Sequence, residues 1–142
     1  MLLLHPIIQG VSIALALSAL LLGLQRVRSL HLQQQVRFRR NVHVRLGMVA
    51  VGGLLIGAGV GLAMTRYAWG RSFMTMGHGV GGMITLSLFL VGGATGWILY
   101  RKPKKRSWLP AVHGVANAAG VLSALHQVST GIEVYRTFAT GL

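Results

Sequence analysis

Six histidines are the residues of this 142-residue sequence best able to do chemistry, because the chain has a single acidic residue and no cysteine. Paired-carboxylate hydrolysis and a Ser-His-Asp triad therefore lack their acidic residues. Disulfides, cysteine-ligated metals and covalently attached c-type haem lack their thiols. Imidazole remains available for hydrogen bonding, proton transfer and metal ligation.

Four uncharged, mostly apolar stretches must position these histidines. They are residues 1–25, 46–65, 72–100 and 107–132. An apolar run of about 18 or more residues is long enough to cross a bilayer as a helix. We therefore predict an all-α integral membrane protein that forms a single up-down four-helix bundle domain over residues 1–142. Its helices are expected at about 4–25, 43–65, 74–100 and 108–132.

The Lys and Arg residues favour one end of such a bundle. Eleven of the fourteen lie between the first and second stretches or between the third and fourth, and only Arg66, Arg71 and Arg136 lie at the other end. Excess Lys and Arg mark the cytoplasmic side, so we expect both termini on the non-cytoplasmic side of a bacterial inner membrane or a thylakoid-type membrane. Charges in short gaps between spans contact lipid head groups, so membrane lipid rather than nucleic acid is the expected partner.

Each predicted helix begins near a histidine. In an antiparallel bundle, His5 and His78 lie at the outer end, and His43 and His113 lie at the cytoplasmic end. Short connections make sequential helices neighbours, so the first helix is diagonal to the third and the second to the fourth. Each end then holds two facing imidazoles, which suits the two axial positions of a haem iron. The alternative is four histidines that reach the interface or hydrogen-bond to neighbouring helices.

His126 is a further candidate for the outer end, thirteen residues after His113. On an ideal helix it points about 140° away from His113. It could replace His5 as the partner of His78, because His5 lies close to the N-terminus. The diagonal arrangement favours His5, which leaves His126 to donate to a propionate, a quinone or a backbone carbonyl.

A glycine follows each of the four helix-initial histidines by eighteen residues. These glycines are Gly23, Gly61, Gly96 and Gly131. Five turns return to the same helix face. Two helices share further glycines at matching offsets, namely Gly47 and Gly57 after His43, and Gly82 and Gly92 after His78. The glycines fourteen or more residues beyond a histidine lie at the depth of the other pair, where they would leave room for a porphyrin held by that pair; ordinary small-residue helix packing is the alternative.

The stretches that contain these residues resemble the core of the cytochrome b561 family. The resemblance rests on 37–47, 78–82, 106–113 and 124–131. The His5-Pro6 opening and the 130–133 ending are similar to small four-helix relatives of unknown function. The resemblance implies two b-type haems per chain, ligated by His5 with His78 and by His43 with His113, and electron transfer across the membrane.

Positive side chains are expected beside the haem propionates. The candidates are Arg40, with Arg39 or Arg45, at the cytoplasmic end and Arg71 at the outer end; solvated interfacial charge is the alternative. Gln9 and Asn117 either support a ligand or a quinone, or hydrogen-bond between helices.

We expect an electron-transfer protein or redox subunit rather than a stand-alone enzyme. Its partners would be redox proteins or a quinone, and it could belong to a larger membrane complex. Two other classes stay open: a subunit that binds chlorophyll-type pigment within a photosynthetic or respiratory complex, and a structural subunit without a cofactor.

Overall fold

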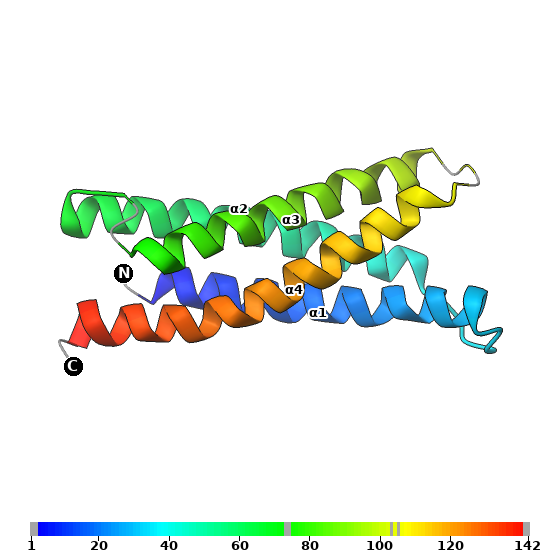
Figure 1. Ribbon diagram of the computed structural model, residues 1–142, viewed down its shortest axis with the longest axis horizontal. Helices are drawn as coiled ribbons and strands as arrows, with labels where there is room; N and C mark the ends of the chain where they lie inside the picture. Colours follow the sequence, from blue (N-terminus) through cyan, green and yellow to red (C-terminus); the bar gives the residue numbers. More distant parts are fainter. Residues whose placement is uncertain (1–2, 73–74, 103, 105, 141–142) are drawn as a thin grey trace.

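The computed structural model describes residues 3–72, 75–102, 104 and 106–140, and these form an antiparallel helical bundle (Figure 1). Its elements are α1 (Leu4–His31), α2 (Arg40–Trp69), α3 (Met76–Arg101), α4 (Trp108–Tyr135) and the π-helical η1 (Arg136–Thr140). Each of the four long helices is long and apolar enough to cross a membrane. The predicted all-α membrane four-helix bundle is confirmed.

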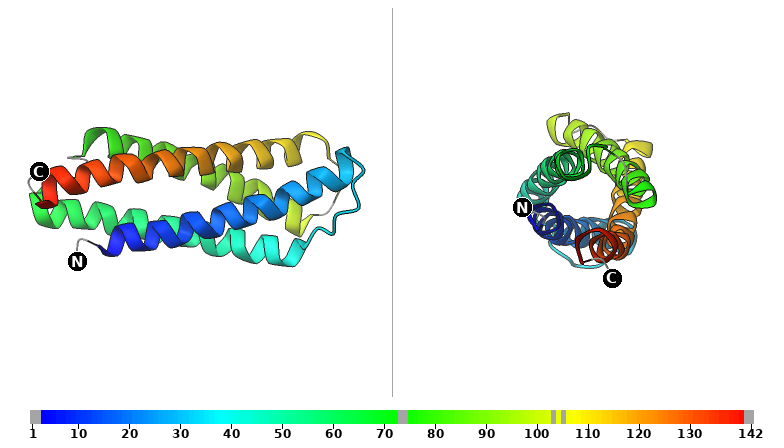
Figure 2. Two further views of the ribbon diagram at one scale, coloured as in Figure 1. Left: turned by 90° about the horizontal axis from the view of Figure 1, so that it is seen from below. Right: turned by 90° about the vertical axis from the view of Figure 1, so that its left-hand side faces the viewer.

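The bundle consists of two helical hairpins. α1 packs along α2 and α3 packs along α4, while the hairpins meet more sparsely through α1–α4 and α2–α3 contacts. Viewed end on, the helices follow one another around a ring (Figure 2). This order places α1 diagonal to α3 and α2 diagonal to α4, as the short connections predicted.

The helices extend beyond the apolar stretches from which they were predicted. α1 continues to His31, and α2 begins at Arg40 and ends at Trp69. Arg, Leu and Gln are good helix formers, so loss of hydrophobicity does not end a helix. Gly70 ends α2, because its φ of 69° is left-handed and its N–H bonds to the Arg66 carbonyl. The predicted start of the third helix at residue 74 falls outside the described residues.

Small and branched residues, together with one phenylalanine, form the core at mid-length of the bundle. The cluster comprises Ile13, Ala16, Ala50, Leu54, Phe89, Val121 and Ala124. Phe89 is 2% exposed, and its ring lies 3.3 Å from where a Cβ on Gly120 would stand. Many large apolar side chains, such as Ile7, Val115 and Leu122, point outward instead. An apolar exterior of this kind suits contact with lipid chains.

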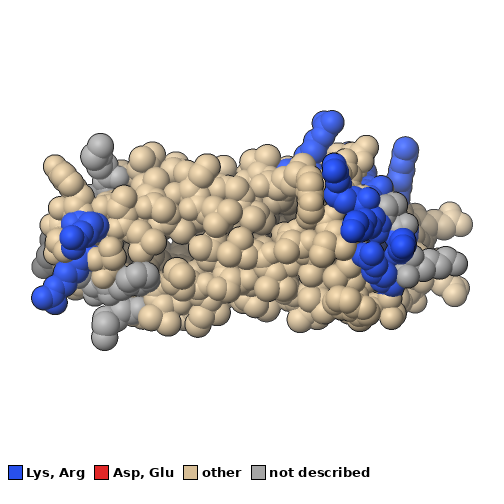
Figure 3. All heavy atoms as spheres, turned by 90° about the horizontal axis from the view of Figure 1, so that it is seen from above, with Lys and Arg blue, Asp and Glu red and all other residues tan. Residues whose placement is uncertain are grey.

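The two ends of the bundle differ in charge. Lys and Arg gather where α1 ends, α2 begins and α3 is joined to α4, and few lie at the end that holds both termini (Figure 3). We call these the basic end and the terminal end. The uncharged length between them matches an apolar membrane interior.

Candidate functional site

The structure brings four histidines together as two pairs. At the terminal end, the ring centroids of His5 on α1 and His78 on α3 lie 6.2 Å apart, with ring planes at 89°. At the basic end, those of His43 on α2 and His113 on α4 lie 6.0 Å apart, at 79°. Both pairs join diagonal helices, so each spans the bundle interior.

This spacing lies within the range of an edge-to-face ring contact, and it also equals the centroid separation of two imidazoles on opposite sides of one metal ion. A metal–imidazole bond of about 2.0 Å and a further ~1.1 Å from nitrogen to ring centre put the two centroids about 6.2 Å apart. Rotation about the metal–nitrogen axis leaves that separation unchanged, so nearly perpendicular rings are equally compatible. Within the described residues, no three His, Asp or Glu side chains could hold a metal ion. A metal between one pair would therefore take its remaining ligands from outside these side chains, as haem iron takes nitrogen ligands from its porphyrin.

Each of the four imidazoles is anchored through Nδ1 to the other helix of its own hairpin. Nδ1 lies 2.7 Å from the Gly57 carbonyl in His5 and 2.8 Å from the Ala19 carbonyl in His43. In His113 it lies 2.9 Å from the Gly92 carbonyl. In His78 it lies 2.9 Å from the hydroxyl of Thr130, which itself donates to the Gln127 carbonyl at 3.2 Å.

These bonds determine which ring nitrogen is free. A carbonyl oxygen only accepts, so Nδ1 of His5, His43 and His113 carries the proton. The Thr130 hydroxyl uses its proton on Gln127, so it accepts from Nδ1 of His78. In the neutral imidazoles Nε2 then keeps its lone pair, and no described residue hydrogen-bonds to it. Metal-ligating histidines typically donate their second N–H in this way, which orients the ring.

Each glycine that lies eighteen residues beyond a histidine is in close contact with the imidazole of the neighbouring helix of its hairpin. We call these four residues the seating glycines. A Cβ on Gly61 would lie 2.7 Å from Nδ1 of His5, and one on Gly96 would lie 2.8 Å from Cε1 of His113. A Cβ on Gly23 would lie 3.3 Å from Cε1 of His43, and one on Gly131 would lie 3.2 Å from Cε1 of His78. An imidazole from the neighbouring helix therefore occupies the space beside each of these glycines, where the sequence suggested room for a porphyrin.

The two hairpins repeat this arrangement. His5 and Gly23 on α1 correspond to His78 and Gly96 on α3, each 73 residues later. The histidine and glycine of α2 likewise correspond to those of α4, each 70 residues later. Ala19 and Gly92, whose carbonyls accept from His43 and His113, obey the same 73-residue offset. The bundle is thus a pseudo-twofold pair of hairpins, and each diagonal pair takes one histidine from each.

The glycines at the shorter offsets differ in what surrounds them. A Cβ on Gly47 would meet open space, and one on Gly82 would only touch Oε1 of Gln127 at 3.9 Å. A Cβ on Gly57 would lie 2.9 Å from the Gln9 amide carbon, and the Asn117 amide fills the space at Gly92. Open space one turn after a paired histidine is therefore found at Gly47 and, in large part, at Gly82, whereas side-chain amides fill the space at Gly57 and Gly92.

The other predicted site residues lie outside the pairs. His126 is exposed on α4, and no described residue hydrogen-bonds to it. Arg71 is exposed in the turn after α2. Arg40 is engaged with α3: it donates to the Tyr100 carbonyl at 3.1 Å, and its guanidinium carbon lies 5.2 Å from the centre of the Tyr100 ring.

The two polar residues predicted to support the site, Gln9 and Asn117, make different contacts. Asn117 donates to the His113 carbonyl at 2.7 Å, and its amide nitrogen lies 3.3 Å from Nδ1 of His113. Gln9 reaches the Leu54 carbonyl at 3.4 Å and so links α1 to α2, while its buried Oε1 has no partner among the described residues. Asn117 therefore touches a histidine of a pair, and Gln9 bridges helices.

Sequence reasoning missed two side chains beside the histidines. Thr130 accepts the Nδ1 proton of His78, and the Phe38 ring centroid lies 5.5 Å from that of His43. The signal that could have found Thr130 is its place one residue before the seating glycine Gly131. Phe38 lies in the connection between α1 and α2, where helical periodicity gives no guide.

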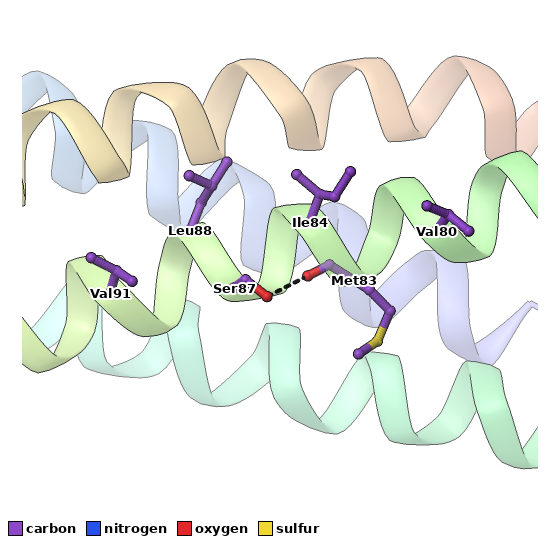
Figure 4. Close-up of a pocket in the computed structure, with 6 residues that line it drawn as sticks. All are labelled: Val80, Met83, Ile84, Ser87, Leu88 and Val91. Atoms are coloured by element: carbon purple, nitrogen blue, oxygen red, sulfur yellow. Dashed lines mark hydrogen bonds between the residues drawn. The ribbon is translucent and has the colours of Figure 1, made fainter.

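A separate groove lies along the outer face of α3, away from the histidine pairs. It is lined by Val80, Met83, Ile84, Ser87, Leu88 and Val91 (Figure 4). Its only hydroxyl, that of Ser87, donates to the Met83 carbonyl of the same helix at 2.9 Å. A groove whose polar group is already satisfied suits lipid chains rather than a redox group.

Comparison of the chain with protein-family models, curated proteins and solved structures found no match.

Proposed function

We propose that this protein transfers electrons across a membrane through two b-type haems, one held by His5 and His78 and the other by His43 and His113. The supporting observation is the pairing itself: two diagonal imidazole pairs at 6.2 and 6.0 Å, each ring anchored through Nδ1. Haem supplies a reversible one-electron iron couple, whose potential the protein sets through ligands, burial and nearby charge.

The chain's own residues prepare these positions. Hydrogen bonds on Nδ1 hold each imidazole in one tautomer, and the seating glycines let each ring approach the adjoining helix closely. The apolar core around Phe89 separates the two layers and excludes water between them. The layers stand about 27 Å apart by helix rise, since eighteen residues separate His5 from the glycine that seats His43.

The same geometry argues against the two other classes. A chlorophyll-type magnesium needs only one imidazole, so it would not require a second ring at this distance. A purely structural bundle would not require that all four histidines donate through Nδ1 and leave Nε2 free. The resemblance to the cytochrome b561 family points to the same function, with a quinone or a redox protein as electron partner.

A reduced-minus-oxidised absorption spectrum of the purified protein tests this function. We expect a reversible b-type spectrum and two haems per chain, determined from extracted haem and protein concentration. A red-absorbing pigment would support the pigment-binding alternative. A colourless protein that takes up no added haem would refute the proposal.

The charge asymmetry makes a prediction about orientation. We propose that the basic end faces the cytoplasm, because Lys and Arg are retained on that side. The chain lacks cysteine, so single cysteines at Lys104 and at Tyr67, which is 91% exposed near the terminal end, can be labelled separately. A membrane-impermeant maleimide should label Tyr67→Cys in intact cells and label Lys104→Cys only after lysis. The reverse pattern would invert the topology.

Thr130 should tune the haem at the terminal end. Thr130→Val keeps the side-chain shape but removes the acceptor of the His78 N–H, which makes the imidazole a weaker donor to ferric iron. We expect the haem to be retained and its midpoint potential to rise, by about 60 mV for each tenfold loss of ferric over ferrous affinity. Redox titration measures this. Thr65→Val is the matched control, because that hydroxyl bonds only within α2; an equal shift in both variants would exclude a specific role.

A further inference from the structure

A second groove lies at the basic end, where α3 ends and α4 begins. Its volume is about 600 Å³, and its lining includes Trp97, Arg101, Lys102, Arg106, Trp108 and Leu109. It differs from the groove along α3 because three of these side chains are cationic. It is also independent of the histidine pairs, since none of the four histidines lines it.

The cationic side chains of this basic groove have no acidic partner. The only acidic residue of the chain is Glu133, roughly 40 Å further along α4 by helix rise. One terminal guanidinium nitrogen of Arg106 is buried and has no hydrogen-bond partner within the described residues. A buried donor on a charged group is costly to leave unpaired. Three cationic side chains that line one groove and have no acidic partner make this groove suited to receive an anion.

The remaining walls are aromatic and apolar. Trp97 and Trp108 are 52% and 65% exposed, whereas Leu109 is 3% exposed and forms part of the base. The Arg101 guanidinium carbon lies 5.2 Å from the centre of the Trp97 ring, so the guanidinium lies over the indole ring. Exposed tryptophans at the end of a membrane span mark the level of the lipid head groups. An occupant of this groove thus meets both cations and apolar surface.

We propose that the basic groove binds the phosphate head group of an anionic phospholipid from the leaflet at the basic end. Arg presents a planar fork of donors that matches phosphate oxygens, and Lys102 adds a point charge. Basic pockets between membrane helices bind anionic head groups on this principle. The tryptophans and Leu109 would contact the glycerol and the first part of the acyl chains. A soluble phosphate ion would satisfy the cations but leave this apolar surface unused.

Native mass spectrometry tests this site. The purified full chain in detergent is titrated with dioleoyl-phosphatidylglycerol or with dioleoyl-phosphatidylcholine. We expect one phosphatidylglycerol to bind at least about tenfold more tightly than phosphatidylcholine. Arg106→Gln should weaken phosphatidylglycerol binding about tenfold, because it removes a charge-assisted hydrogen bond. Arg106→Lys should retain an intermediate affinity, because it keeps the charge but loses the fork. Arg37→Gln removes an exposed charge from the same end of the bundle and should change the affinity less than about twofold.

Three results would overturn the proposal. Equal affinity for the two lipids would show that the groove does not select an anion. Equal losses in Arg106→Gln and Arg37→Gln would show non-specific attraction by net charge. Displacement of phosphatidylglycerol by millimolar inorganic phosphate would show a site for a soluble anion.

If Arg106→Gln does not fold, as judged by gel filtration and circular dichroism, Lys102→Gln at an exposed position provides the same comparison. Haem content does not enter the readout, so failure here leaves the electron-transfer proposal standing.

Discussion

Replacing His5 or His78 with alanine is expected to remove one of two haems per chain and to leave the other in place. The same loss should follow His43→Ala or His113→Ala, but for the haem at the basic end. Each iron would lose one of its two histidine ligands, and the two histidines outside the pairs, His31 and His126, are both exposed and do not replace it. Pyridine haemochrome analysis of the purified variants measures the stoichiometry directly.

His126→Ala is the matched control for these variants. It lies on the same helix as His113 but makes no hydrogen bond with a described residue, so both haems should remain. His5→Ala combined with His78→Ala should resemble either single variant, whereas His5→Ala combined with His43→Ala should remove both haems. Loss of a haem in His126→Ala with retention in His5→Ala would overturn the pairing and would place ligands for both haems on α4.

The sequence predicts which histidines meet because depth and order can be counted along it. Helix rise gives the depth of His43 and His113 relative to His5 and His78, and short connections give the order of helices around the bundle. Uncharged length likewise predicts the four spans. The helix ends were harder to predict from the sequence, since α1 continues through Arg26 and Arg28 to His31 after its apolar stretch has ended.

The role of the glycines could not be read from one helix alone. Counting along α2 shows that Gly61 shares a face with His43, and this suggested a role toward a porphyrin in the other layer. The ring against Gly61 belongs to His5, because the antiparallel register of α1 and α2 brings these two residues level. Register between helices depends on side-chain packing across the whole hairpin, which helical periodicity does not report. The hydroxyl of Thr130 was missed for the same reason.

Gly61→Val should therefore cause loss of the haem at the terminal end, although Gly61 lies on the helix that supplies His43 to the basic end. A Cβ at this position would lie 2.7 Å from Nδ1 and 2.9 Å from Cε1 of His5, so the imidazole must move and its bond to the Gly57 carbonyl must break. Overpacking of this kind typically costs about 1–3 kcal/mol, which is enough to displace one side chain without unfolding a bundle.

Gly59→Val is the matched control, because Gly59 is exposed on the same helix and a Cβ there would meet nothing within 4 Å. We expect Gly59→Val to keep two low-spin haems and Gly61→Val to keep one. Combining Gly61→Val with His43→Ala should remove both haems, whereas combining it with His5→Ala should cause no further loss.

A smaller substitution, Gly61→Ala, separates the two roles considered for this glycine. If the glycine seats His5, the haem stays bound through His78, becomes high-spin and returns to low-spin with added imidazole. If the glycine makes room for the porphyrin, the haem is lost and added imidazole does not restore it.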